Sequence, residues 1–321
     1  MPLVPMPISP RLHENVESAR VAMWAWLEHF NLVPETSRVH VQRICAERVT
    51  CWMQPNARTE QIEFLAQWMV WLFIIDDQFD DYGGKNLTRW DRQAAETMAA
   101  LDGVRPSRRD PVATALWDLL DRTFAIRSAY WRERFVWNLR RYVLAFRAET
   151  ALRGQRQLPT VNDFLRHRLE SVASEAWLDL TEIGAEVDLP LEVHACPDFQ
   201  VARTATCYSL ALINDLYSLR KEIGYGYTFN TVTLVAAERR VSMQRAVDYV
   251  VGLHAQAMDD FRSAEDRLRA ELPDAHRRAA LRAIHGYASV CTGNQAWSME
   301  VPRYAQPNAT PLPMDNIMGC E

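Results

Sequence analysis

At two places in this chain, a run of apolar residues leads directly into a cluster of oxygen-bearing side chains. Residues 68–75 read WMVWLFII and precede the acidic segment DDQFDD at 76–81, while the run at 208–213 precedes NDLYSLRKE at 214–222. Both places have helical character, so the oxygen atoms should emerge at the end of buried helical surface. Because unpaired charge beside apolar surface is costly, a bound cation or a fixed counter-charge is expected there. The two clusters together predict a divalent metal site.

Helical periodicity continues over most of the chain from Glu14 onward. Strand-like alternation over five or more residues is hard to find, and 11 glycines are few for 321 residues. We therefore predict an all-α bundle. The expected helices cover residues 14–31, 36–53, 59–83, 90–101, 109–125, 129–152, 161–186, 198–224, 228–239, 242–271 and 274–300.

Residues typical of helix starts support these bounds, and the distribution of prolines indicates the domain organisation. Pro111 lies near a helix start, Thr160 precedes an apolar helical pattern, and Pro273 precedes the last long pattern. No linker divides the chain, so residues 1–305 are predicted to form one domain. The proline-containing tail at 306–321 cannot continue a helix, so we expect it to be disordered or to cover one end of the bundle.

Composition argues against several classes of protein. A formal net charge of -5 and a pI near 6.0 give no general reason to expect nucleic acid or an anionic membrane as a partner. The 6 cysteines are scattered without zinc-site spacing, so we expect reduced thiols. No signal-peptide pattern is found at the start of the sequence, and the longest apolar run is too short to span a bilayer. The expected location is therefore the cytoplasm.

The spacing within each cluster places its oxygen atoms on one helical face. On a helix, Asp76 stacks with Asp80, and Asn214, Ser218 and Glu222 follow one another at four-residue intervals. Amide, hydroxyl and carboxylate oxygens are hard ligands that suit Mg²⁺. Taken singly, a solvated acidic helix end and an ordinary polar helix face remain alternative interpretations.

Together the two motifs resemble those of the microbial, bacterial-type class I terpene synthases. The aspartate-rich motif DDxx(x)D/E of that family is matched at 76–81, and its NSE triad NDxxSxx(K/R)E is matched at every specified position at 214–222. The resemblance covers roughly residues 10–305. It implies a class I terpenoid synthase fold, in which antiparallel helices surround a deep apolar active-site cavity and the two motifs face each other at its mouth.

The resemblance also implies a metal centre. Three Mg²⁺ ions would bridge the two motifs to the diphosphate of a linear prenyl substrate. The residues that would hold them are Asp76, Asp80, Asn214, Ser218 and Glu222. Among these, Asp76 would be the direct ligand of the first motif, and Asp80 would take a supporting or salt-bridging role.

Several hydrogen-bond donors to the diphosphate follow from the same resemblance. The diphosphate-sensing arginine of the family falls 46 residues before the triad asparagine, which is Arg168 here, with Arg166 as the neighbouring alternative. The other implied donors are Lys221 and the pair Arg303-Tyr304. Arginine suits this role because its planar fork donates two hydrogen bonds at once to a phosphate. A helix turn whose backbone carbonyl helps to trigger ionisation would fall near residues 171–173, although no glycine marks it.

The chain is also rich in aromatic residues, with 11 Trp, 11 Phe and 10 Tyr. Most must be core residues, but aromatic faces can stabilise a carbocation without quenching it. Phe73 and Trp297 match aromatic pocket positions of the family, and we expect both to line the cavity. Phe79 and Tyr217 are expected to pack away from it.

The function implied by the resemblance is Mg²⁺-dependent ionisation and cyclisation of a linear prenyl diphosphate, with release of diphosphate. The DxDD motif of protonation-initiated cyclases is missing because position 78 is Gln. Farnesyl diphosphate is the favoured substrate, which would make the product a cyclic sesquiterpene. Geranylgeranyl or geranyl diphosphate, a prenyl-elongating synthase, and a non-catalytic protein that binds prenyl diphosphates are the alternatives. A homodimer, with a second copy of the chain as partner, is left open.

Overall fold

The computed structural model describes residues 3–82, 87–107, 109–153, 158–224 and 229–305. Within these ranges every regular element is a helix, which confirms the predicted fold class. The helices are α1 (Val16–His29), α2 (Glu35–Ile44), α3 (Ala46–Met53), α4 (Thr59–Tyr82), α5 (Leu87–Leu101), α6 (Pro111–Phe124), α7 (Ala129–Arg153), α8 (Val161–Ser171), α9 (Ser174–Gly184), α10 (Leu191–His194), α11 (Pro197–Gly224), α12 (Thr231–Arg239), α13 (Met243–Glu271), α14 (Asp274–Glu300) and α15 (Pro302–Ala305). The predicted tail at 306–321 lies outside the described residues.

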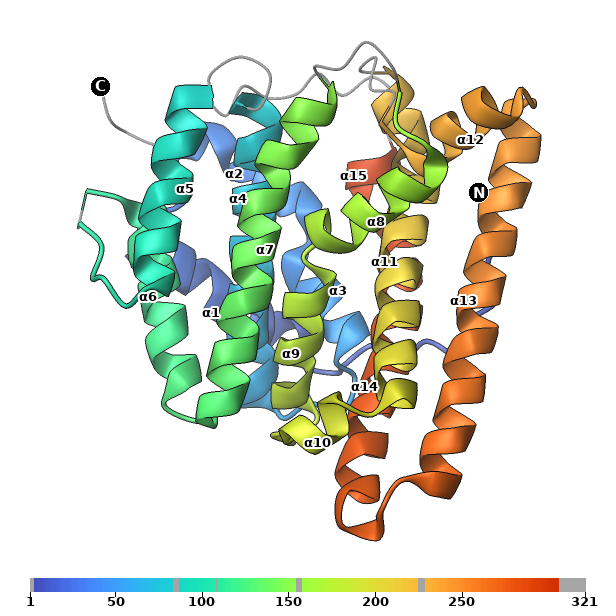
Figure 1. The fold of residues 1–321 in the computed structure, drawn as a ribbon. Coiled ribbons are helices and arrows are strands. Elements are labelled where there is room, and N and C mark those ends of the chain that lie inside the picture. Colours follow the sequence, from blue (N-terminus) through green and yellow to red (C-terminus); the bar gives the residue numbers. More distant parts are fainter. Residues whose placement is uncertain (1–2, 83–86, 108, 154–157, 225–228, 306–321) are drawn as a thin grey trace.

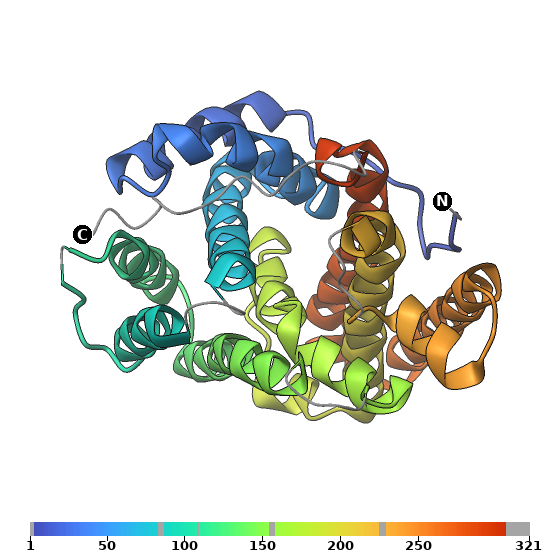
Figure 2. The same cartoon turned by 90° about the horizontal axis from the view of Figure 1, so that it is seen from above.

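The long helices run side by side (Figure 1) and form a ring when seen along the bundle (Figure 2). Helices α5 and α6 flank the ring on one side, and α12 and α13 flank it on the other, where α13 packs along α11. Helix α1 packs against α3 and α4. The carboxyl ends of α4 and α11 reach the same end of the bundle, where α8 and α15 also lie (Figure 1). This arrangement brings together the ends of the two apolar runs.

Several predicted helix starts are confirmed. The Asp110 carboxylate accepts a hydrogen bond from the backbone N–H of Ala113 at 2.8 Å, and Pro111 is the first residue of α6. Thr160 caps α8 by accepting from the backbone N–H of Asp163 at 3.1 Å. Such caps satisfy N–H groups that a helix start leaves unpaired.

The prediction of one continuous helix over 36–53 is wrong. Cys45 has φ 52° and ψ 51°, and this left-handed residue separates α2 from α3. An L-residue other than glycine adopts this conformation at a cost of roughly 1–2 kcal/mol. The break leaves the carbonyl of Ile44 at the end of α2, where it accepts a hydrogen bond from the indole N–H of Trp297 at 2.9 Å. A contact distant in sequence therefore helps to hold the break.

The predicted helix over 161–186 is also interrupted, at the position where the family resemblance implied a turn. Helix α8 ends at Ser171 and α9 begins at Ser174, and Ala173 between them has φ 54° and ψ 14°. The short helices α10 and α15 were not predicted from the sequence.

The core consists of a main cluster in the ring and a second cluster between α8, α11, α12 and α13. Helix α14 approaches α3 so closely that a Cβ atom at Gly293 would overlap the backbone of Trp52 and Met53. The cysteines in the described ranges, Cys45, Cys51, Cys196, Cys207 and Cys291, are free thiols, as predicted. No described helix combines the length and apolar character needed to cross a lipid bilayer.

Candidate active site

A cavity opens between α4, α7, α8, α9, α11 and α14, and it encloses about 1360 Å³ when the space at its mouth is included. We call its polar lining residues the rim. The rim consists of Asp76, Glu149, Arg168, Ser171, Asn214, Asp215, Ser218, Lys221, Glu222, Asn294 and Tyr304. We call the apolar lining residues the wall. The wall consists of Val49, Met53, Met69, Leu72, Phe73, Tyr142, Phe146, Val172, Ala173, Trp177, Leu210, Phe229 and Trp297.

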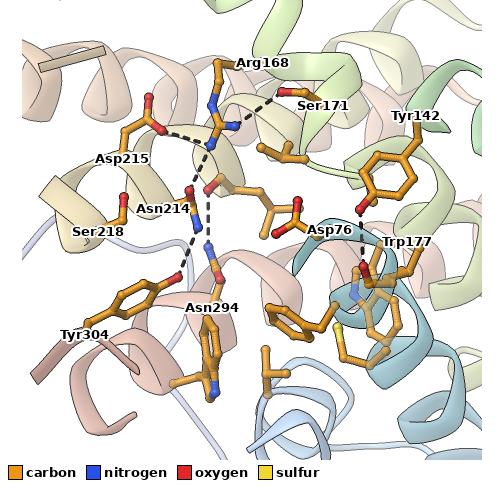
Figure 3. Close-up of a pocket in the computed structure, with 18 of the residues that line it drawn as sticks. Asp76, Tyr142, Arg168, Ser171, Trp177, Asn214, Asp215, Ser218, Asn294 and Tyr304 are labelled. Atoms are coloured by element: carbon orange, nitrogen blue, oxygen red, sulfur yellow. Dashed lines mark hydrogen bonds and ion pairs between the residues drawn. The ribbon is translucent and has the colours of Figure 1, made fainter. Parts of the chain in front are cut away.

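Arg168 joins the two helices that carry much of the rim. From α8 it donates to the Asn214 side-chain oxygen at 2.8 Å and forms an ion pair with Asp215 at 2.9 Å. It also donates to the hydroxyl of Ser171 at 3.3 Å, as Figure 3 shows. Burial alone would lower the pKa of Arg168, but Asp215, and to a smaller extent Glu149, raise it above its ordinary value. The alternative, Arg166, is exposed and pairs with Asp163 at 2.6 Å.

The three triad residues lie along one side of α11 and line the same cavity. The Asn214 amide donates to the hydroxyl of Tyr304 at 3.1 Å, which joins α11 to α15 (Figure 3). The Ser218 hydroxyl is buried, and its hydrogen-bonding contact with the Glu222 carboxylate acts to lower the pKa of that carboxylate. The Glu222 carboxylate accepts from the Asn230 amide at 2.8 Å. Burial, and next the charge of Asp215, raise the pKa of Glu222 to about 7.

Neighbouring aspartates of the acidic segment on α4 face different surroundings. Asp76 lines the cavity and lies across it from α11 (Figure 3). Asp77 is buried, and its carboxylate lies 2.8 Å from the imidazole Nε2 of His40 on α2. The side chain of Asp80 lies outside the described part of the chain, so its predicted role stays a prediction.

Two of the other predicted diphosphate donors have described side chains, and one does not. Tyr304 on α15 and Lys221 on α11 both line the cavity. The side chain of Arg303 lies outside the described residues. The structure thus brings Tyr304 and Lys221 to the triad without placing Arg303.

The aromatic wall matches the sequence prediction. The rings of Phe73 and Trp297 have centroids 5.6 Å apart, and those of Trp297 and Tyr304 are also 5.6 Å apart. Tyr217 is buried in the second core cluster, away from the cavity lining. The side chain of Phe79 lies outside the described residues.

Several lining residues were not singled out from the sequence, among them Asp215, Glu149, Trp177 and Asn294. Asp215 pairs with Arg168 and accepts from the Thr231 hydroxyl at 2.5 Å, and Glu149 lines the cavity from α7. Trp177 and Asn294 also line the cavity. Asp215 lies inside the second motif and could have been selected there. No local pattern marks the other three.

The rim has the chemistry of a cation site. Among the described lining residues, four side chains are carboxylates and two are cationic. The side-chain oxygens of Asn214, Ser218 and Glu222 are the hard donors that Mg²⁺ prefers. The buried Ser218 hydroxyl beside Glu222, together with this excess of negative charge, fits a bound divalent cation. The described residues contain no cluster of three or more His, Cys, Asp or Glu side chains poised to hold a metal, so amide and hydroxyl oxygens would have to complete the ligand set.

This fold and rim define a class I terpene synthase. The model of the family described as "Terpene synthase family 2, C-terminal metal binding" matches residues 67–260. The matched segment contains both motifs and most of the rim. The chain belongs to this family, as a class I enzyme of the bacterial type.

Characterised relatives match over almost the full chain. The (2Z,6E)-hedycaryol synthase of Kitasatospora setae is 29% identical, covering 96% of this chain and 95% of the relative. The (+)-T-muurolol synthase of Roseiflexus castenholzii, described as (2E,6E)-farnesyl diphosphate cyclizing, is 30% identical over 93% of this chain and 92% of the relative. The structure of hedycaryol synthase with nerolidol superposes with a TM-score of 0.79 at 26% identity, covering 92% of this chain and 98% of that one.

Proposed function

We propose that this enzyme ionises farnesyl diphosphate in a Mg²⁺-dependent reaction and cyclises the resulting carbocation to a sesquiterpene, releasing inorganic diphosphate. The observation that carries the proposal is the meeting of two chemistries in one cavity. Asp76 and the triad of α11 supply oxygen ligands at the rim, and the aromatic and aliphatic wall continues from them.

The metal would be held by Asp76 on one side and by Asn214, Ser218 and Glu222 on the other, with Asp80 in support. Bound Mg²⁺ would supply positive charge to the diphosphate oxygens and make the diphosphate a better leaving group. Three ions are proposed, as in the family that the motifs resemble.

The cationic side chains near the rim would orient the leaving group. Arg168, Lys221 and Arg303 would donate to diphosphate oxygens, and the Tyr304 hydroxyl would add a neutral donor. Arg168 now donates to Asn214 and pairs with Asp215, so it is held by neighbours that also line the rim. Preorganised donors of this kind stabilise developing charge without reorganising at the moment of reaction.

The wall would handle the cationic hydrocarbon. Phe73 and Trp297 present aromatic faces that attract positive charge and contain no base strong enough to quench it. The apolar surroundings also exclude water, which would otherwise trap the cation early as an alcohol. The reaction would end by loss of a proton or by capture of one water molecule.

The C15 chain length is supported by the relatives, because the T-muurolol synthase is described as a farnesyl diphosphate cyclase. A diterpene cyclase acting on geranylgeranyl diphosphate remains the second candidate. A prenyl-elongating enzyme would carry a second DDxxD motif where this chain has Asn214 and Ser218.

The test is incubation of the purified chain with Mg²⁺ and, in separate reactions, geranyl, farnesyl and geranylgeranyl diphosphate. Phosphate analysis measures released diphosphate, and gas chromatography of a hexane extract identifies the hydrocarbon or alcohol. The expected result is diphosphate release with a cyclic C15 product from farnesyl diphosphate. A longer organic product that retains its diphosphate, or no release from any substrate, would contradict the proposal. The Asn214→Ala variant, purified in parallel, controls for contaminating phosphatase.

A further inference from the structure

The break between α8 and α9 brings strained backbone to the cavity. Ala173 has φ 54°, and residues 171–173 all contribute to the cavity lining. Ser171, at the end of α8, accepts a hydrogen bond from Arg168. The conformation of the break therefore affects both the shape of the wall and the direction of the Arg168 guanidinium.

A non-glycine residue in the left-handed region costs of order 1–3 kcal/mol and persists when its surroundings hold it. Local bonds supply part of the restraint. The Ser174 hydroxyl donates to the carbonyl of Leu169 at 3.2 Å, and the N–H of Trp177 donates to the carbonyl of Ala173 at 2.9 Å. The first bond crosses the break and the second lies within α9, so neither fixes the break relative to the rest of the ring.

Arg203 supplies that longer-range restraint from α11. Its guanidinium donates to the Glu175 carboxylate from Nε at 3.0 Å and from Nη2 at 2.5 Å. Nη2 also donates to the backbone carbonyl of Glu175 at 3.1 Å. Nη1 donates to the hydroxyl of Tyr287 on α14 at 3.0 Å. One side chain thus ties the first turn of α9 to two other helices.

The burial of Arg203 and the pKa of Glu175 both reflect the contact between the two side chains. Arg203 is 2% exposed, so its charge depends on protein partners. Burial alone would raise the pKa of Glu175, but the charge and hydrogen bonds of Arg203 hold it below its ordinary value. Arg203 also pairs with Asp179 at 3.0 Å, and Asp179 in turn pairs with Arg134 at 2.9 Å.

We propose that Arg203, acting through Glu175, is a positioning residue that holds the helix break at Ala173 against the cavity and so sets the direction of Arg168. The proposal rests on the proposed function only where it concerns turnover. Two N–H groups of Arg203 donate to the same oxygen of Glu175, Oε2, and Nη2 also reaches the Glu175 backbone carbonyl, so the contact fixes an angle as well as a distance. Apolar packing alone would leave the first turn of α9 free to slide.

The chain offers a matched control for the test. Arg134 belongs to the same buried network and pairs with Asp179 at 2.9 Å and Glu182 at 2.6 Å, but its ion pairs and hydrogen bonds connect α7 to the middle of α9 and not to the break. Arg203→Lys and Arg134→Lys therefore each remove one buried guanidinium that bonds carboxylates of α9. Glu175→Gln is the milder variant, because Arg203 keeps Asp179 and Tyr287 as partners.

Crystal structures of the variants give a readout that does not depend on activity. In Arg203→Lys, and to a smaller extent in Glu175→Gln, we expect Ala173 to leave the left-handed region or Arg168 to lose its contact with Ser171. In Arg134→Lys, both features should stay in place. An unmoved break in both Arg203→Lys and Glu175→Gln would overturn the proposal, as would the same displacement in the control. If Arg203→Lys does not fold, Glu175→Gln decides.

Kinetics with farnesyl diphosphate provide the second readout. For Arg203→Lys we expect kcat to fall about tenfold or more, while KM changes by less than about twofold. A loss of this size is common when a residue orients a substrate-binding side chain without touching the substrate itself. The product mixture should change as well, whereas Arg134→Lys should keep the wild-type mixture. Unchanged kcat and products in Arg203→Lys would reject the positioning role. Absence of diphosphate release from the wild type would instead reject the proposed function, and the crystal structures would still decide the role of Arg203.

Discussion

The rim and the wall of the cavity share helices α4, α7 and α11, yet the rim carries charged and polar groups whereas the wall carries apolar and aromatic ones. On α4, Phe73 of the wall and Asp76 of the rim are three residues apart, and on α11, Leu210 and Asn214 are four residues apart. One helical turn, a rise of about 5 Å, therefore separates apolar surface from oxygen ligands on both sides of the cavity. This short distance lets one substrate place its diphosphate among cations and its hydrocarbon chain among aromatic rings.

The comparison predicts two kinds of variant. Changes in the rim should remove ionisation and leave nothing to cyclise. Changes in the wall should leave ionisation in place and redirect the carbocation. A rim variant that only altered the product, or a wall variant that only abolished diphosphate release, would break the distinction.

The largest effect is expected for the triad. Asn214→Ala and Glu222→Ala should each lower kcat/KM by about 10³-fold or more, because each removes an oxygen ligand and leaves the leaving group less well stabilised. Diphosphate release under saturating Mg²⁺ measures the effect, and far-UV circular dichroism should stay helical. Asp266→Ala, an exposed acidic position on α13, is the control and should match the wild type. Near-normal turnover in both triad variants would exclude the α11 metal site.

A smaller loss is expected for Arg168→Lys. Lysine keeps the charge but cannot bind Asn214, Asp215 and a diphosphate oxygen with one planar fork, so we expect kcat/KM to fall about 100-fold. Arg166→Lys is the matched control, because Arg166 is exposed and contacts Asp163 three residues away on the same helix. Should Arg166→Lys show the larger loss, the diphosphate-sensing role would belong to Arg166.

The rim should also depend on pH. The pKa of Glu222 is raised to about 7 by burial and by Asp215, and the carboxylate must be ionised to bind a cation. Protons therefore compete with Mg²⁺ below pH 7, and the Mg²⁺ concentration for half-maximal rate should rise about tenfold between pH 8 and pH 6. Steady-state rates over a Mg²⁺ titration at each pH measure this shift. Saturating Mg²⁺ should restore most of the rate at pH 6, and a half-saturation value independent of pH would contradict the prediction.

A variant in the wall should change the product mixture more than the rate of ionisation. Trp297→Phe removes the indole N–H that donates to the Ile44 carbonyl and frees the ring to turn beside Phe73. We expect a changed product mixture in gas chromatography, with kcat reduced by less than about tenfold, since the loss of one aromatic contact is worth about 0.5–1.5 kcal/mol. Trp137→Phe, at a site that is 62% exposed on α7, should leave the products unchanged. An unchanged mixture in Trp297→Phe would remove this residue from the specificity-determining wall.

The sequence was sufficient to predict the parts of the site that are local. Four-residue spacing on one helix places Asn214, Ser218 and Glu222 on the same side of α11 wherever that helix lies. The position of Phe73 one turn before Asp76 follows in the same way. Regular helical geometry is determined by the chain itself, so these predictions needed no tertiary information.

The two helix breaks show why the rest was harder to predict. Cys45 and Ala173 adopt left-handed conformations without glycine, and the segments around them are strongly helical in pattern. Each break has a partner distant in sequence: Trp297 donates to the carbonyl of Ile44, and Arg203 holds the start of α9. The family resemblance implied the second break but not the first.

The same reason accounts for the missed side chains. Asp215 gains its importance from Arg168 on α8 and Thr231 on α12, and His40 reaches Asp77 from α2. Neither partnership leaves a periodic signal. The motif could have marked Asp215, but the partners that give these residues their roles became visible only in the structure.

The smallest effect on the reaction is expected for the contact between α3 and α14, two helices that carry part of the wall. A Cβ atom at Gly293 on α14 would overlap the backbone of Trp52 on α3, so Gly293→Ala must push the two helices apart. We expect a loss of about 1–3 kcal/mol in the free energy of unfolding, together with a small change in products because Trp297 lies one turn further along α14. Gly252→Ala on α13 is the matched control. No atom lies within 4 Å of a Cβ placed there, so it should stabilise the chain by about 0.5–1 kcal/mol through helix propensity. Urea denaturation measures both changes. Equal midpoints for the two variants would show that α3 and α14 can move apart without a loss in the free energy of unfolding.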